Sequence, residues 1–183
     1  MKKSHVIIIS VVAVILILLG WGISQNNSLV NLSENINQNQ SEIDNQLKRR
    51  ADLIPNLVST VKGSTNAETK VIEDISNARA GMTSGTTDQK LAASDNLTKN
   101  INILIENYPN IKFSAAYTGL MDELSGTENR IAVARKNYND VVASYNKKVR
   151  SFPINIVAKM LGYSQKTYLQ IEESEKATPQ VQF

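Results

Sequence analysis

The sequence predicts an all-α protein in which a single N-terminal transmembrane helix precedes an antiparallel helical bundle with four main helices, two of them long. Three observations support this fold class. An apolar stretch without a charged residue runs from Val6 to Ile23. Beyond it, apolar residues recur at intervals of three and four, which is the spacing of one helix face. Alternating patterns typical of strands are weak throughout the chain.

The apolar stretch reads VIIISVVAVILILLGWGI and has 18 residues. At 1.5 Å per residue it spans roughly 27 Å, close to a bilayer core of about 30 Å. A cleaved signal peptide is the alternative, since Gly22 and Ser24 place small residues at plausible cleavage positions. Trp21 suits the membrane interface and favours retention. We therefore expect a short tail at residues 1–5, a transmembrane helix at 6–23, and the lipid bilayer as a partner.

The distribution of basic residues predicts an orientation. Lys2 and Lys3 precede the apolar stretch, and the next basic residue is Lys48. Because positively charged flanks stay in the cytoplasm, we expect a single-pass protein of the cell membrane. Its N-terminus is predicted to be cytoplasmic and the rest of the chain extracytoplasmic.

The first long helix of the bundle is predicted from about Ser28 to Lys62. Its apolar residues are spaced by threes, fours and a seven, and Gly63-Ser64 ends it. Pro55 lies inside this pattern, so a kink or break is expected there. The helix is also expected to continue back into the membrane span through 25–29.

Two shorter helices follow. The first covers about Asn66 to Ala80, and the segment GMTSGTT at 81–87 is predicted to be a loop because of its Gly, Ser and Thr content. The second runs from Asp88 to Asn107 and ends at Tyr108-Pro109.

The last long helix carries the clearest pattern in the chain. Two positions of a heptad repeat, counted from Phe113, hold an apolar or aromatic residue at ten of twelve places. Such a repeat builds a narrow, coiled-coil-like seam for packing against other helices. The twelve residues are Phe113, Leu120, Thr127, Ala134, Val141 and Lys148, and Tyr117, Leu124, Ile131, Tyr138, Tyr145 and Phe152. The predicted bundle spans 24–150, and 151–183 forms a short helix (about 154–161) with a polar tail that packs on the bundle or trails from it.

Composition excludes several function classes. Without Lys2 and Lys3, 18 Lys+Arg face 17 Asp+Glu, so the net charge is +1 and gives no footprint for nucleic acid. The chain has no cysteine, and its single histidine is His5 beside the anchor. Thiolate or imidazole metal sites and His-dependent triads are therefore excluded, and we expect no metal, no cofactor and no catalytic residues.

Two polar segments form the candidate site. One is the basic run around Arg50 on the first long helix, which could clamp a phosphate or lipid head group or simply form a solvated helix face. The other interrupts the apolar seam at 127–130, where a polar layer would fix the register of the helices. The candidate polar interaction cluster consists of Arg49, Arg50, Asp52, Thr127, Glu128, Asn129 and Arg130. The expected pairs are Glu128 with Arg49 or Arg50, Arg130 with Asp52 or another carboxylate, and Asn129 or Thr127 with backbone near Pro55.

Several blocks of the sequence resemble the LemA family of bacterial membrane proteins. They are QLKRRADLIPNLVSTVKG at 46–63, ELSGTENRIAVAR at 123–135, the pairs Tyr138-Asn139 and Tyr145-Asn146, the C-terminal residues Phe152-Pro153, Asn155, Ala158 and Gly162, and PQVQF at 179–183. The resemblance covers nearly the whole chain. It implies a mostly helical bundle behind an N-terminal membrane segment, and it implies no catalytic residue set.

These observations favour a membrane-anchored, non-enzymatic interaction or scaffold protein. Its expected partners are other proteins of the membrane or envelope, and homo-oligomerisation is left open. The alternative is a protein that binds a small ligand or a lipid head group between its helices. A hydrolase that uses only carboxylates and tyrosines is a third hypothesis, but no acid–base pair can be placed from the sequence.

Overall fold

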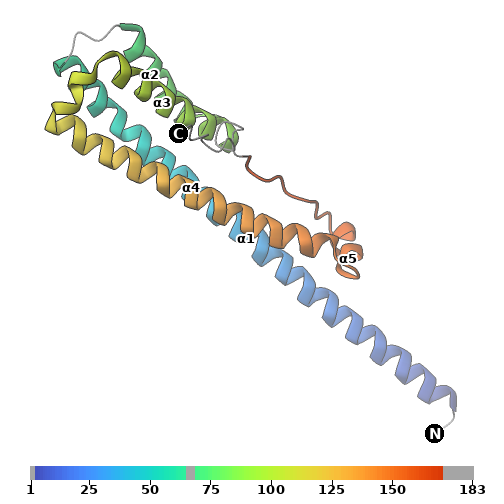
Figure 1. The fold of residues 1–183 in the computed structure, drawn as a ribbon. Helices are drawn as coiled ribbons and strands as arrows, with labels where there is room; N and C mark the ends of the chain where they lie inside the picture. The colour runs from blue at the N-terminus through green and yellow to red at the C-terminus, as the bar shows by residue number, and fades with distance from the viewer. Residues whose placement is uncertain (1–2, 65–68, 171–183) are drawn as a thin grey trace, which may run out of the picture. The chain divides into compact units, whose positions relative to one another are not determined.

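The computed structural model describes residues 3–64 and 69–170. These residues form helices and no strand (Figure 1), which confirms the all-α class. The elements in order are α1 (Lys3–Ser64), α2 (Thr69–Thr83), α3 (Thr87–Asn107), the 3₁₀ helix η1 (Pro109–Phe113), α4 (Ala115–Arg150) and α5 (Ile154–Met160). The chain divides into two compact units. The first unit contains Met1–Gln38 and Tyr138–Tyr168, and the second contains Asn39–Asn137 and Leu169–Phe183.

Helix α1 is continuous over 62 residues (Figure 1). It joins the apolar stretch to the first predicted bundle helix, as expected from the residues at 25–29. It also continues past Pro55 to Ser64, so the expected break at the proline is wrong. Proline removes one backbone donor. Ala51, Ile54 and Leu57 are all at most 1% exposed, and this packing on both sides of the proline accounts for the persistence of the helix.

The apolar stretch of α1 is exposed along its length. It makes α1 long and apolar enough to cross a membrane, and none of its most apolar window is buried in the protein. Ile17, for example, is 70% exposed. Isolated apolar residues on a surface need no explanation, but a contiguous stretch of this size indicates a nonpolar environment outside the protein.

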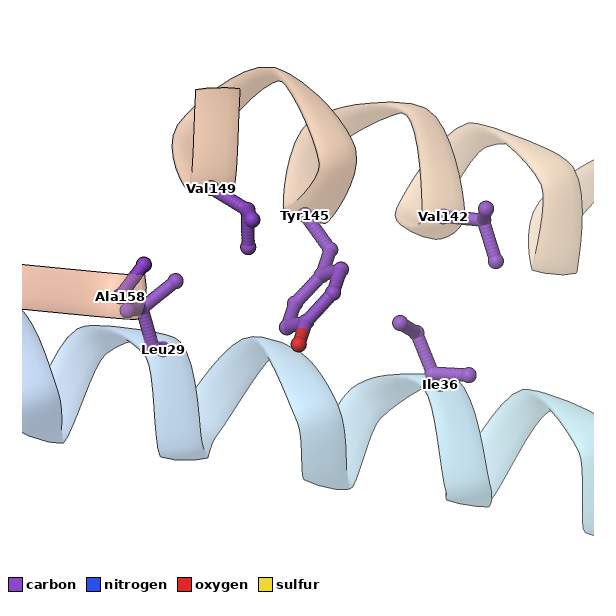
Figure 2. Packing of buried hydrophobic residues seen from close by; sticks show 6 residues of the cluster. All are labelled: Leu29, Ile36, Val142, Tyr145, Val149 and Ala158. Atoms are coloured by element: carbon purple, nitrogen blue, oxygen red, sulfur yellow. The ribbon is translucent and has the colours of Figure 1, made fainter. Parts of the chain in front are cut away.

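In the first unit, α1 packs against α4 and α5 through a small apolar core. Figure 2 shows Tyr145 reaching from α4 toward α1, between Leu29 and Ile36. The buried residues of this core are Leu29, Ile36, Val142, Tyr145, Val149 and Ala158. Burial raises the pKa of the Tyr145 hydroxyl, and Tyr163 adds to the effect.

Hydrogen bonds fix the last segment of the first unit. Asn146 on α4 donates from Nδ2 to the carbonyl of Lys166 over 2.8 Å, and its Oδ1 accepts from the Lys166 N–H over 2.8 Å. One amide side chain thus pairs with a backbone in the way a neighbouring strand would. Tyr163 donates to Asn26 on α1 over 2.9 Å, and Lys148 donates to Ser28. The described part of the predicted tail is therefore attached at several points, while 171–183 lies outside the described residues.

In the second unit, α2 and α3 pack against each other. The loop predicted at 81–87 is mostly wrong, since α2 continues to Thr83 and α3 begins at Thr87. Gly81 lies inside α2, and a Cβ there would meet the Ala93 Cβ on α3 at 2.7 Å, so the close approach of the two helices accounts for the glycine. Thr86 starts α3 with a capping box. Its side chain accepts from the Gln89 N–H, and the Gln89 side chain accepts from the Thr86 N–H.

The seam of α4 follows the predicted heptads over its first half. Tyr117, Leu124 and Ile131 are at most 4% exposed. Toward the C-terminal end the buried positions become Val142 and Val149 rather than Val141 and Lys148. A straight helix drifts about 20° per heptad, which moves the buried face by one residue after several turns. Phe152 lies beyond the end of α4 and is 81% exposed, so its assignment to the seam is wrong.

Candidate functional site

Arg50 is the centre of a polar network in the second unit. It lies on the buried face of α1 and is only 2% exposed. Its Nη1 donates to the Ser94 hydroxyl, and its Nη2 donates to the Thr98 hydroxyl over 2.7 Å, both on α3. The same Nη2 lies 3.4 Å from Glu128 Oε2 on α4. A single guanidinium thus connects three helices.

The network balances a costly buried charge. Burial lowers the pKa of the Arg50 guanidinium below its usual value, and the carboxylates of Glu128 and Asp95 oppose that shift. Thr98 also donates to Glu128 Oε1 over 3.3 Å, which positions the carboxylate. Arg50 Nε is buried and has no hydrogen-bond partner. Both terminal nitrogens of the guanidinium therefore have partners, and Nε has none.

A second buried arginine extends the network along α4. Arg135 is 8% exposed, and its Nη1 lies 3.8 Å from Asp95 Oδ2 on α3. Its Nη2 donates to the carbonyl of Gln170 over 2.8 Å, and this bond attaches the backbone at Gln170 to α4. Sequence reasoning did not select Arg135. Its position one residue after Ala134, a seam residue, is the signal that could have found it.

Two more polar contacts join α1 to α3. Lys90 Nζ lies 2.9 Å from Asp44 Oδ1, and Gln40 Nε2 donates to the Thr87 hydroxyl over 2.9 Å. Because Arg50, further along α1, also contacts α3, polar contacts recur along the α1–α3 interface. Such contacts would favour one register of the two helices, and that role stays a prediction.

The structure brings together only part of the predicted cluster. Arg50 and Glu128 form the expected pair, whereas Arg49 and Asp52 are exposed. Arg130 is exposed too and forms no ion pair with Asp52, so that expectation is wrong.

Thr127 does not bond to backbone near Pro55. It is 1% exposed, and its hydroxyl donates to the Leu124 carbonyl of its own helix over 2.7 Å. A threonine satisfied within its own turn needs no partner on another helix. In this polar segment it is Glu128, beside the seam, that contacts other helices, and the role of the cluster as an interaction site stays a prediction.

Asn129 and Arg130 line an open groove instead. The groove has a volume of about 330 Å³ and lies between α1 and α4 within the second unit. Its other lining residues are Glu42, Gln46, Val133, Ala134 and Asn137. Val133 is 58% exposed there. Among residues 3–64 and 69–170, no three His, Cys, Asp or Glu side chains are grouped to hold a metal ion.

Comparison with known proteins connects this architecture to a family. The model of the LemA family matches residues 39–183. The chain belongs to the LemA family. The match covers the second unit and the α4–α5 part of the first, so the Arg50 network and the Asn146 contact both lie in the region that the LemA model describes.

Two relatives have sequence similarity over most of this LemA-family chain. Protein LemA of Metamycoplasma hominis is 25% identical over 159 residues, which cover 84% of this chain and 73% of the relative. Magnetosome protein MamQ 2 of Paramagnetospirillum magneticum is 25% identical over an alignment 193 residues long, gaps included. This alignment covers 89% of this chain and 70% of the relative. The N-terminal apolar helix and this similarity together indicate membrane association.

Proposed function

We propose that this LemA-family protein is a single-pass membrane scaffold, without enzymatic activity, that presents an interaction surface to other envelope proteins. The observation that carries the proposal is the continuity of α1. The same helix supplies the exposed apolar stretch and the buried side chains of both units. One helix therefore joins the apolar stretch directly to residues that pack in the folded part of the chain, with no linker segment between them.

The predicted antiparallel bundle is part of this proposal. In the first unit Lys148 on α4 contacts Ser28 on α1, and Figure 2 shows Val142 of α4 opposite Ile36 of α1. Partners that come later on α1 thus come earlier on α4. This order supports an antiparallel course of the two long helices, with α2 and α3 as the shorter pair.

The absence of enzymatic activity is supported by how the buried polar groups are used. Arg50, which is only 2% exposed, donates to Ser94, Thr98 and Glu128 within the protein. This use of a buried cation suits a structural role in holding helices together rather than a role in chemistry. The interaction surface is instead the groove at Val133, where an exposed apolar side chain is flanked by polar ones.

Site-specific crosslinking in intact membranes tests the scaffold. The chain has no cysteine, so Val133→Cys gives a unique attachment point for a photoreactive crosslinker. Ser125→Cys, on an exposed part of α4, is the matched control. We expect the same adducts to recur from position 133 and to be weak from position 125. Recovery of no reproducible protein adduct from position 133 would contradict the proposal.

The groove also supports a second candidate function, which is binding of a small ligand or lipid head group. Its volume of about 330 Å³ suits a small molecule, and Glu42 and Arg130 supply charges of both signs. Arg130→Gln should then abolish ligand-induced thermal stabilisation of the purified protein. A scaffold without a ligand would show no stabilised state in a metabolite and lipid screen.

Orientation is tested separately. The proposal keeps the N-terminus in the cytoplasm because Lys2 and Lys3 precede the span. Protease added to intact protoplasts should digest the part of the chain beyond the anchor. Protection until lysis would reverse the orientation without affecting the scaffold.

A further inference from the structure

Helix α5 presents large apolar side chains to the outside of the first unit. Its inner face, Val157 and Ala158, contacts the protein, but Ile156 is 54% exposed and Met160 is 82% exposed. Leu161 follows at 53%, and Phe152 precedes the helix at 81%. Four large apolar residues within ten positions are therefore uncovered, although the small core beside them is well packed.

The position of α5 along α1 says which environment covers these residues. Val157, Met160 and Leu161 share an apolar groove of about 390 Å³ with Leu18, Leu19, Gly22, Ile23 and Asn26. Figure 1 shows α5 beside this part of α1. Ile23 is the last residue of the apolar stretch, and Leu18 lies about 7.5 Å before it at 1.5 Å per residue. If α1 spans a bilayer, α5 therefore lies at the depth where the hydrocarbon meets the head groups.

Basic residues surround the same region. Between Tyr138 and Tyr168 the chain has five basic residues and a single acidic one, Asp140. The basic residues are Lys147, Lys148, Arg150, Lys159 and Lys166. The near-neutral charge of the whole chain beyond the anchor hides this asymmetry. Lys148 bonds to Ser28, five residues beyond Ile23, so the end of α4 is about 7.5 Å above the apolar stretch, at head-group level.

Two of these cations converge on one hollow. Lys147 and Arg150 line a depression of about 370 Å³ together with Asn146 and Tyr168. An apolar face at the hydrocarbon boundary, combined with cations at head-group level in the same unit, is the chemistry of an interfacial, anionic-lipid-binding element. Phosphate oxygens suit Lys and Arg side chains as acceptors.

We propose that α5 and the end of α4 form a second membrane contact, in which Phe152, Ile156, Met160 and Leu161 enter the interface of the same bilayer that α1 crosses and the neighbouring cations bind anionic head groups. This inference rests on the membrane anchor of the proposed function. It adds that the protein binds the bilayer at two points, so that the first unit is held upright on the membrane surface.

A single-cysteine fluorescence experiment tests the contact. Full-length Met160→Cys, labelled with an environment-sensitive dye, is reconstituted into phosphatidylcholine vesicles with and without phosphatidylglycerol. Spin-labelled lipids then report depth by quenching. Leu16→Cys is the control for the anchor, and Ser144→Cys, exposed on α4 in the same unit, is the control for a position in water.

We expect quenching at position 160 to be several-fold stronger than at 144, strongest with a spin label near the head group, and increased by phosphatidylglycerol. Quenching at 16 but not at 160 would overturn the second contact while leaving the anchor intact. Absence of quenching at 16 would instead overturn the anchor and the proposed function with it. A blue-shifted dye at 160 that lipid spin labels do not reach would mean a protein partner covers α5, which also overturns the inference.

The cations are tested by Lys159→Gln combined with Lys166→Gln. The double variant should lose most of the added quenching that phosphatidylglycerol causes at position 160, and the quenching at 16 should stay constant. Equal quenching at 160 in both vesicle types for the unmodified background would refute the role assigned to the basic residues.

Discussion

The Thr98 hydroxyl occupies the point where the buried charge network is most easily perturbed. It accepts from Arg50 Nη2 over 2.7 Å and donates to Glu128 Oε1 over 3.3 Å. Thr98→Val removes only this hydroxyl, because valine has nearly the same shape and a similar helix propensity. Any loss of stability therefore reports the network rather than a cavity or a backbone effect.

The magnitude follows from the groups left without partners. A hydrogen bond to a charged group contributes about 1.5–3 kcal/mol. Arg50 is 2% exposed, so water does not replace the lost acceptor, and its Nε already has no partner. The Glu128 side chain is 45% exposed, and water can replace the lost donor there. We expect a net loss of about 2 kcal/mol, which lowers the Tm of a chain of this size by roughly 4–8 °C.

Thr127→Val is the matched control. Thr127 is also a helical threonine on the buried side, but its hydroxyl bonds only to the carbonyl of Leu124 within its own turn. The variant should unfold within about 0.5 kcal/mol of the unmodified protein, since no buried charge loses a partner. Thermal and urea unfolding of the detergent-solubilised chain measure both values. If the two valine variants were equally stable, the register role of the Arg50 network would be refuted.

Three further predictions concern other parts of the chain. Asn146→Ala removes both hydrogen bonds to Lys166 and should cost about 1–3 kcal/mol, with faster limited proteolysis near 163–168 as the local readout. Gly81→Ala should destabilise by about 1–3 kcal/mol because of the contact with α3, whereas Gly126→Ala, which has open space, should stabilise by about 0.5–1 kcal/mol, so an equal response of the two in thermal unfolding would disprove the close approach. The raised pKa of Tyr145 means that above pH of about 10 the unfolded chain releases a proton that the folded chain retains, so stability should fall as pH rises there, and Tyr145→Phe should flatten that fall in urea titrations.

Periodicity alone was sufficient for the helices and for most of the buried face of α4. Leu124 and Ile131 are buried as the heptads require, because the spacing of three and four is a property of the helix itself. It failed where tertiary packing overrides local preference. Gly81 looks like a loop residue in the sequence, but it lies inside α2. A glycine is needed there because α3 approaches too closely for a side chain.

The candidate site was only partly predictable for a similar reason. The sign of the charges and the position of Glu128 beside the seam residue Thr127 were enough to select its pairing with an arginine at 49 or 50. Neither Ser94 nor Thr98 could be selected, since a lone hydroxyl on a helix carries no pattern that distinguishes a buried acceptor from a solvated one. Asn146 was visible only as part of a resemblance, because its partner is backbone and backbone leaves no trace in the sequence.

The continuity of α1 also fixes how the apolar stretch is rotated about the helix axis relative to the rest of the first unit. Leu18 and Gly22 face α5, and Leu29 and Ile36 face α4, all on one helix without a swivel between them. Inserting one residue between Ser24 and Gln25 would turn everything before it by about 100° and shift it by about 1.5 Å. Leu18 would then turn away from α5, although every side chain of the anchor would be unchanged. The folded part of the first unit therefore determines in which direction each face of the transmembrane segment points.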